Sequence, residues 1–76
     1  MSEQLCRARI AQNAQTREPT LDLSSLDLTS LPETIGELTH LEALDLSWNR
    51  PLQLPPELAN LTKLRKLDLS FPNQSI

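Results

Sequence analysis

The leucines of this chain recur with a fixed period of 23 residues. Three of them return with unchanged spacing, Leu41, Leu44 and Leu46 as Leu64, Leu67 and Leu69. The Leu-Pro step at position 31 likewise returns at position 54. A period of about 20 to 29 residues with leucines at such offsets is typical of stacked strand-and-turn units. The period therefore predicts an α/β repeat fold rather than independent helices and strands.

Composition limits the chain to one small domain with an aliphatic core. It has 76 residues, of which 17 are leucine, with one Phe and one Trp. A net charge of −3 and a pI near 4.9 argue against a nucleic-acid partner, because such surfaces need clustered Lys and Arg. Cys6 is the single cysteine, so no intramolecular disulfide is possible, and cytoplasmic localisation is expected. No apolar run is long enough for a signal peptide or a membrane span, so no membrane association is expected.

The period divides the chain into units 18–40, 41–63 and a partial unit 64–76. Residues 41–49 alternate apolar and polar side chains, as a strand with one buried face does, and Thr20–Ser24 and Lys66–Ser70 repeat this pattern. Strands that all run the same way should form a parallel sheet lining an inner curve. The return segments 32–39 and 55–62 space their apolar residues by three, which favours 3₁₀ turns on the outer face.

Asn49 lies where the second strand ends, and its amide could bond turn backbone that would otherwise be buried unpaired. Leu26 and Pro72 occupy the equivalent positions in the other units, and Pro51 replaces the apolar residue that Leu28 supplies. We therefore expect a single complete asparagine turn.

Residues 1–17 are expected to form an amphipathic capping helix. Cys6, Ile10 and Ala14 share one face with Leu5 alongside. Repeat arrays need a cap over their first apolar layer. No matching cap follows Leu69, so we expect the isolated chain to be marginally stable or to self-associate through this open edge.

The segments Leu41–Asn49 and Leu54–Leu61 resemble the leucine-rich repeat family, of the 23-residue type with a Leu-Pro step. The sequence of residues 35–39 is similar to that of intracellular repeats in Ras-binding scaffolds, plant Ras-group proteins and Roco-type GTPases. It resembles the repeats of secreted plant receptors less. The resemblance implies a horseshoe-shaped solenoid segment whose concave strand face binds other proteins, without catalysis by the repeats.

Outward-facing strand positions should stack into columns on the concave face. The predicted protein-binding residues on these columns are Asp22, Asp45, Asp68, Ser47, Trp48, Lys66 and Phe71. Aligned aspartates repel one another, which a basic partner or a cation could offset. The alternative is that water and the adjacent serines solvate them.

Trp48 and Phe71 fall at the same repeat position, where they form either an exposed hot spot or mutual packing at the open end. The basic residues Arg50, Lys63, Arg65 and Lys66 cluster nearby and are expected to be a solvated face or one half of weak surface ion pairs. His40 lacks partner ligands for a metal or a triad, and one glycine cannot build a phosphate-binding loop. No enzyme activity, metal or cofactor is expected.

Two functional hypotheses follow. The first is a protein-interaction module that binds a protein partner on the concave face. The second is the amino-terminal repeat segment of a larger signalling enzyme, a Roco-type GTPase or a kinase, in which a later domain catalyses and the repeats act in signal transduction.

Overall fold

The computed structural model describes residues 2–49 and 52–70. One helix is followed by short strands that alternate with 3₁₀ turns. In chain order the elements are α1 (Ser2–Thr16), β1 (Thr20–Asp22), η1 (Glu33–Glu37), β2 (Ala43–Asp45), η2 (Pro56–Asn60) and β3 (Lys66–Asp68). Within the described ranges, no helix is both long and apolar enough to cross a bilayer.

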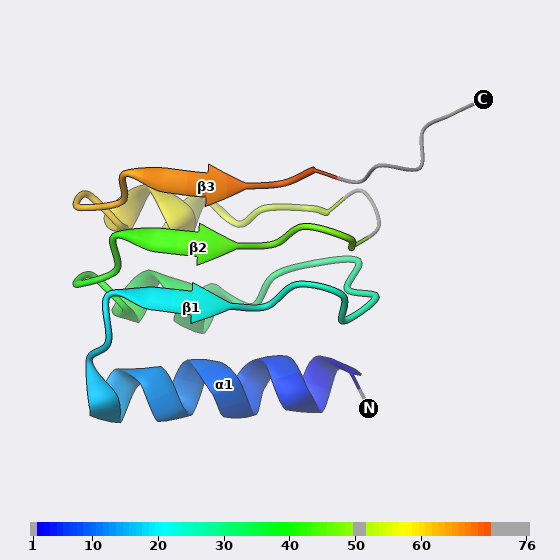
Figure 1. Ribbon diagram of the computed structural model, residues 1–76, viewed down its shortest axis with the longest axis horizontal. Helices are drawn as coiled ribbons and strands as arrows, with labels where there is room; N and C mark the ends of the chain where they lie inside the picture. The colour runs from blue at the N-terminus through cyan, green and yellow to red at the C-terminus, as the bar shows by residue number, and fades with distance from the viewer. Residues whose placement is uncertain (1, 50–51, 71–76) are drawn as a thin grey trace.

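The three strands form a parallel sheet in the order β1-β2-β3, with α1 lying beside β1 and the 3₁₀ turns behind the sheet (Figure 1). Leu21 pairs with Leu44, which pairs with Leu67, so the register follows the 23-residue period as predicted. Each strand is shorter than the alternating sequence pattern suggested. Backbone bonding nevertheless continues beyond them, since the Trp48 N–H donates to the Ser70 carbonyl at 2.8 Å.

The return segments contain the predicted 3₁₀ turns. Pro32 and Pro55 immediately precede η1 and η2 in extended conformation, with φ of −70° and −76°. Proline fixes φ in this range and lacks the N–H that a turn's first residues leave unpaired. Each Leu-Pro step therefore directs the chain from the sheet into the turn.

The core is a stack of aliphatic layers between the sheet and the 3₁₀ turns. Its buried side chains come from α1 and the first two units, with Leu61 of the second return segment: Cys6, Ile10, Leu21, Leu23, Leu26, Leu28, Leu31, Ile35, Leu38, Leu41, Leu44, Leu46 and Leu61. Leu64 is only partly buried, and Leu67 and Leu69 are 37% and 46% exposed. The third layer is thus open, as the sequence predicted.

The buried face of helix α1 agrees only in part with the predicted one. Cys6 and Ile10 are buried in the same cluster as the first leucine layer, but Ala14 and Leu5 are exposed and Asn13 is buried. A helical face that passes through Ile10 continues at position 13 or 14 because the period is 3.6 residues. Asn13 takes the inner position because its amide bonds the chain that follows the helix. Burial also raises the pKa of the Cys6 thiol, against a smaller opposing effect of nearby arginines.

Asn49 forms the predicted turn. Its Oδ1 accepts from the N–H groups of Leu26 at 3.1 Å and Leu28 at 3.0 Å. Its Nδ2 donates to the carbonyls of Leu23 at 3.0 Å and Leu46 at 2.9 Å. One side chain therefore joins the turns of two units, and Leu26 is held by Asn49 instead of making a turn of its own. Pro51 and Pro72 lie outside the described residues.

Candidate functional site

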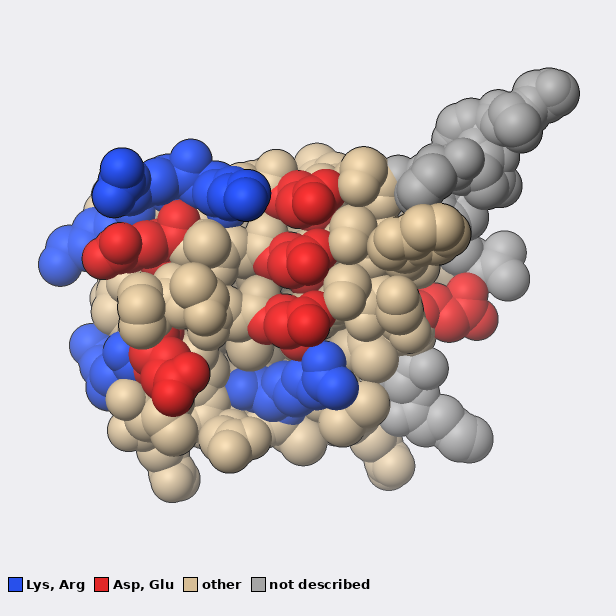
Figure 2. All heavy atoms as spheres, viewed as in Figure 1, with Lys and Arg blue, Asp and Glu red and all other residues tan. Residues whose placement is uncertain are grey.

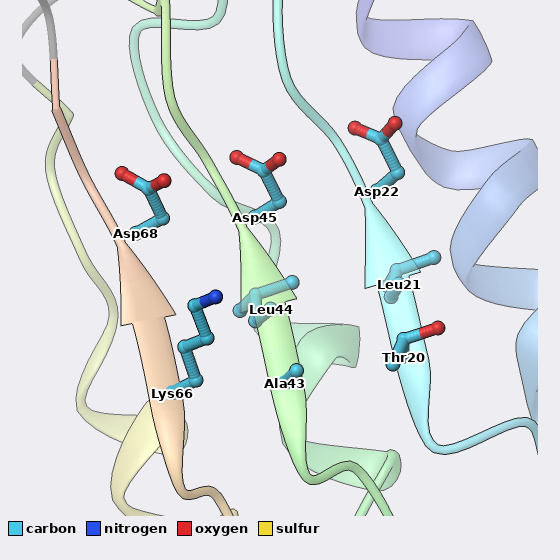
Figure 3. A pocket seen from close by; sticks show the side chains of 8 residues that line it. All are labelled: Thr20, Leu21, Asp22, Ala43, Leu44, Asp45, Lys66 and Asp68. Atoms are coloured by element: carbon cyan, nitrogen blue, oxygen red, sulfur yellow. The ribbon is translucent and has the colours of Figure 1, made fainter.

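Two columns of aligned side chains cross the exposed sheet face. Thr20, Ala43 and Lys66 form the first column, one residue per strand. The second column consists of Asp22, Asp45 and Asp68. Figure 2 shows the aspartates as an acidic line across the middle of this face, and Figure 3 shows their carboxylates pointing the same way. The register predicted from the period is confirmed at both columns.

Each aspartate of the second column makes the same local turn with the serine two residues later. The Ser24 hydroxyl donates to Asp22 Oδ1 at 2.6 Å and its N–H to the same oxygen at 2.9 Å. The corresponding bonds recur in the other two units, Ser47 to Asp45 and Ser70 to Asp68. One oxygen of every carboxylate is therefore used inside the fold. This supports solvation by the adjacent serines over the need for an external cation.

These hydrogen bonds stabilise the charged form of the outer aspartates. The Ser24 hydroxyl and N–H hold the pKa of Asp22 below its ordinary value, and nearby Arg9 lowers this pKa further. The Ser70 N–H and hydroxyl hold the pKa of Asp68 below its ordinary value, with a smaller contribution from Lys66. Donors to a carboxylate favour its ionised form. The acidic column is thus stabilised by donors and cations at its two ends.

A shallow hollow of about 240 Å³ lies on this face around Ala43. Its lining residues come from all three strands: Thr20, Leu21, Asp22, Ala43, Leu44, Asp45, Lys66 and Asp68. In Figure 3 the small Ala43 side chain stands between the longer Thr20 and Lys66, which leaves the middle of the face low. The hollow therefore combines a small apolar floor with three carboxylates on one flank and an ammonium on another.

Trp48 lies in the turn that follows β2 and is 55% exposed. Its backbone φ is +61°, in the left-handed region that a bulky side chain rarely adopts, and Ser25 at the equivalent position has φ of +59°. The repeat's turn therefore requires this conformation and directs the indole to solvent. This exposure favours the hot-spot interpretation of Trp48. Phe71, its predicted neighbour, lies outside the described residues, as does Arg50.

The expectation that Ser47 is exposed on the sheet face is wrong. Its exposed fraction is 6%, and its hydroxyl donates to Asp45 Oδ1 at 2.6 Å. The physical reason is the aspartate turn, which folds the serine back onto the strand end. The N–H and hydroxyl of Ser47 both donate to Asp45 and so position its carboxylate.

Side chains of α1 bond the outer edge of β1, a feature that the sequence analysis missed. Arg9 Nη1 donates to the Asp22 carbonyl at 2.8 Å. Asn13 Nδ2 donates to the carbonyls of Glu18 and Thr20, both at 3.2 Å. An unpaired strand edge invites pairing with other chains. The helix supplies donors for this edge, in addition to covering the first leucine layer.

His40, the last residue of the first unit, joins that unit to α1. Its Nε2 lies 2.6 Å from Asn13 Oδ1. Because Asn13 Nδ2 already donates, Oδ1 is the acceptor and His40 Nε2 carries the proton. The other ring nitrogen, Nδ1, is buried without a hydrogen-bond partner. Burial lowers the pKa of His40, and Arg17 and Lys63 lower it further. His40 is thus a structural residue held in its neutral form.

We expect the chain to lose stability as the pH falls below the unfolded histidine pKa of 6.5. A lowered folded pKa means that the unfolded chain binds more protons in this window, so acidification favours unfolding until the folded pKa is passed. Urea unfolding at about pH 7.5 and about pH 5 measures the loss. His40→Gln keeps a donor for Asn13 but does not titrate. Its urea unfolding midpoints at the two pH values should therefore differ less than those of the unaltered chain. Equal pH dependence in both chains would contradict the assignment.

The remaining basic residues, Lys63, Arg65 and Lys66, are exposed near the start of β3. Figure 2 shows Lys and Arg side chains gathered there. In the described part of the chain, no group of three or more His, Cys, Asp or Glu side chains is arranged to hold a metal ion.

Comparison with known proteins supports the repeat. The family described as Leucine Rich Repeat matches residues 40–61, which span the turn into β2, the strand and η2. A segment of 30 residues is 67% identical to Receptor-like protein 1 of Arabidopsis thaliana. The matched segment covers 40% of this chain and 3% of that protein. The similar protein is named as receptor-like, so the Roco-type resemblance and the intracellular subtype stay predictions.

The family match covers most of the second repeat unit. Residues 40–61 contain the central strand, the Asn49 turn and the second 3₁₀ segment. The parallel sheet and the helix fit the α/β fold of such repeats. We conclude that this chain contains a leucine-rich repeat.

Proposed function

We propose that this chain is a protein-interaction module that binds its partner on the exposed face of the sheet. The observation that carries the proposal is the in-register column Asp22–Asp45–Asp68 beside the hollow at Ala43. Leucine-rich repeats generally mediate protein–protein interaction, and we place the interaction on this concave face of a short solenoid segment capped by α1. We also propose that the chain acts in the cytoplasm and that its repeats do not catalyse a reaction.

The chemistry of the face favours a partner segment with basic and apolar side chains. Each aspartate uses Oδ1 for its serine. Trp48 supplies a large exposed ring at one end of the face. Aromatic side chains of this kind often carry much of the binding energy of an interface. A Lys or Arg placed over Ala43 would meet the carboxylates, while an apolar neighbour would contact Trp48.

Selection from a random peptide library displayed on phage tests this function. We expect the immobilised chain to enrich peptides that bind, and the double variant Asp45→Ala/Trp48→Ala to weaken their binding by about tenfold or more. Loss of one hot-spot contact alone is often worth about 2 kcal/mol. Binding of individual selected peptides is measured by isothermal titration calorimetry.

A matched control removes one acidic and one apolar exposed side chain away from the sheet face. Glu33→Ala/Leu5→Ala makes the same kinds of change on η1 and α1. This variant should bind the selected peptides as the unaltered chain does. Equal binding by both double variants, each with an unchanged far-UV circular dichroism spectrum, would rule out the sheet face as the site.

A second candidate is that these repeats belong to a larger signalling protein, such as a Roco-type GTPase or a kinase. The small share of the similar plant protein that the match covers favours a repeat within a longer chain. The native transcript tests this candidate. An open frame that continues past Ile76 into a GTPase or kinase domain would support it, and a stop codon would remove it.

A further inference from the structure

The two edges of the sheet are treated differently by the rest of the chain. On the β1 side, Arg9 and Asn13 of α1 donate to the outward carbonyls of Asp22 and Thr20. On the β3 side, no further strand or helix follows in residues 52–70. The same edge carries exposed apolar side chains, with Leu67 37% and Leu69 46% accessible. Within the described residues, one edge of the sheet is therefore bonded by α1, and no element lies beside the other edge, formed by β3.

The repeat itself shows which backbone groups of β3 point outward. On β2, Leu46 N–H donates to the Asp68 carbonyl at 2.8 Å, and the Glu42 carbonyl accepts from Arg65 N–H at 2.7 Å. Leu69 lies one period after Leu46, and Arg65 lies one period after Glu42. The Leu69 N–H and the Arg65 carbonyl therefore point away from β2. Alternate residues of a strand face opposite neighbours. Leu67 N–H and its carbonyl therefore also point outward.

We propose that β3 pairs with β3 of a second copy of this chain, antiparallel about a twofold axis at Leu67. In this register Leu67 lies opposite Leu67 of the second copy, and the two exchange N–H to carbonyl hydrogen bonds. The Leu69 N–H of each copy meets the Arg65 carbonyl of the other. The pairing satisfies the outward groups identified on β3 and joins the two sheets into one.

Charge complementarity selects this register. Lys66 lies opposite Asp68 of the second copy, and by symmetry Asp68 lies opposite Lys66 of the second copy. Figure 3 shows both side chains on the same exposed face of β3. Opposite charges directly across an antiparallel pair stabilise it, and like charges destabilise it. Lys66-Leu67-Asp68 is thus self-complementary when reversed, which a twofold interface requires.

The interface involves one short strand from each copy, so the dimer should be weak. We expect a dissociation constant on the order of 0.1 to 1 mM, since the contact is far smaller than that of a stable complex. Dimerisation leaves the two acidic columns exposed side by side. The dimer forms at the edge of β3 and the proposed partner binds the sheet face, but both use the side chains of Lys66 and Asp68.

Charge exchange tests the proposal. Sedimentation equilibrium should show the 8.6 kDa chain associating to a dimer as its concentration rises to about 1 mM. Lys66→Asp and Asp68→Lys each place like charges across the axis, so each alone should associate at least about tenfold more weakly. An equimolar mixture restores both opposite-charge pairs and should dimerise again. A mixture no stronger than the separate variants would overturn the proposal.

A second pair of variants tests the backbone contact without charge. Proline is tolerated on an edge strand where its missing N–H would face away from the sheet. Leu69→Pro removes the outward donor, while Leu69→Ala shortens the side chain and keeps that donor. The proline variant should dimerise at least about fivefold more weakly than the alanine variant, because the dimer loses two backbone hydrogen bonds, one from each copy. Circular dichroism verifies that both fold.

Three further results would overturn the proposal. The first is a monomer throughout this concentration range, and the second is equal dimerisation by the proline and alanine variants. The third is a monomer whose β3 amide resonances instead respond to an added peptide copying residues 41–49. That result would show that the edge accepts a following parallel strand and not a second copy.

Discussion

Asn49→Ala should lower the free energy of unfolding by about 3 kcal/mol or more, a large part of the stability of a domain this small. The side chain is 3% exposed and bonds five main-chain groups of two units. Alanine leaves the Leu26 and Leu28 N–H groups buried without their acceptor, and three carbonyls lose their donor. An unpaired buried polar group costs about 1–3 kcal/mol. Urea unfolding followed by circular dichroism measures the change.

Asn49→Asp separates the hydrogen bonds that the Asn49 side chain accepts from those that it donates. Aspartate keeps an acceptor for the Leu26 and Leu28 N–H groups but places a carboxylate against the carbonyls of Leu23 and Leu46. Protonation would convert one oxygen into a donor toward those carbonyls. The stability difference between this variant and the unaltered chain should therefore shrink as the pH falls.

The outcome for Asn49→Ala decides the role of the side chain. If Asn49→Ala lowered the free energy of unfolding by less than about 0.5 kcal/mol, the ordinary range for surface changes, the side chain would not have the role assigned to it.

The 23-residue period predicted the features that depend on spacing. Strand register, the acidic column and the 3₁₀ return segments all follow from which residues are one period apart. Asn49 was identifiable because an amide at a strand end has a defined hydrogen-bonding task. The exposure of Leu67 and Leu69 follows from the incomplete third unit. Periodicity is a global constraint, so one sequence suffices to read it.

Features that depend on individual side-chain directions were not predictable in this way. Ser47 was placed on the exposed face because its strand position alternates with Leu46, yet its hydroxyl turns back to Asp45. The spacing of aspartate and serine by two residues was a signal for that turn. Helical spacing predicted that Ala14 is buried, whereas Ala14 is exposed and Asn13 is buried. Nothing in the sequence alone indicated that Arg9 and Asn13 would bond the edge of β1.

Gly36→Ala should destabilise the fold by about 1–3 kcal/mol, because the added methyl has no space between the stacked 3₁₀ turns. A Cβ atom at position 36 would lie 2.8 Å from the Glu57 Cβ and 2.9 Å from the Glu57 carbonyl oxygen. Both contacts are shorter than carbon atoms tolerate without movement, and one of them is to backbone. Thermal or urea unfolding measures the loss.

The next repeat contains the matched control. Ala59 lies one period after Gly36, so η2 carries at this position the methyl group that η1 cannot accommodate. Ala59 is exposed, whereas Gly36 is buried under η2. Ala59→Gly should therefore change stability by less than Gly36→Ala and by no more than the intrinsic preference of glycine, about 0.5–1 kcal/mol. Equal effects at both positions would mean that stacking of η2 on η1 does not select glycine. A larger effect at position 36 would show that glycine is required where one repeat packs on another.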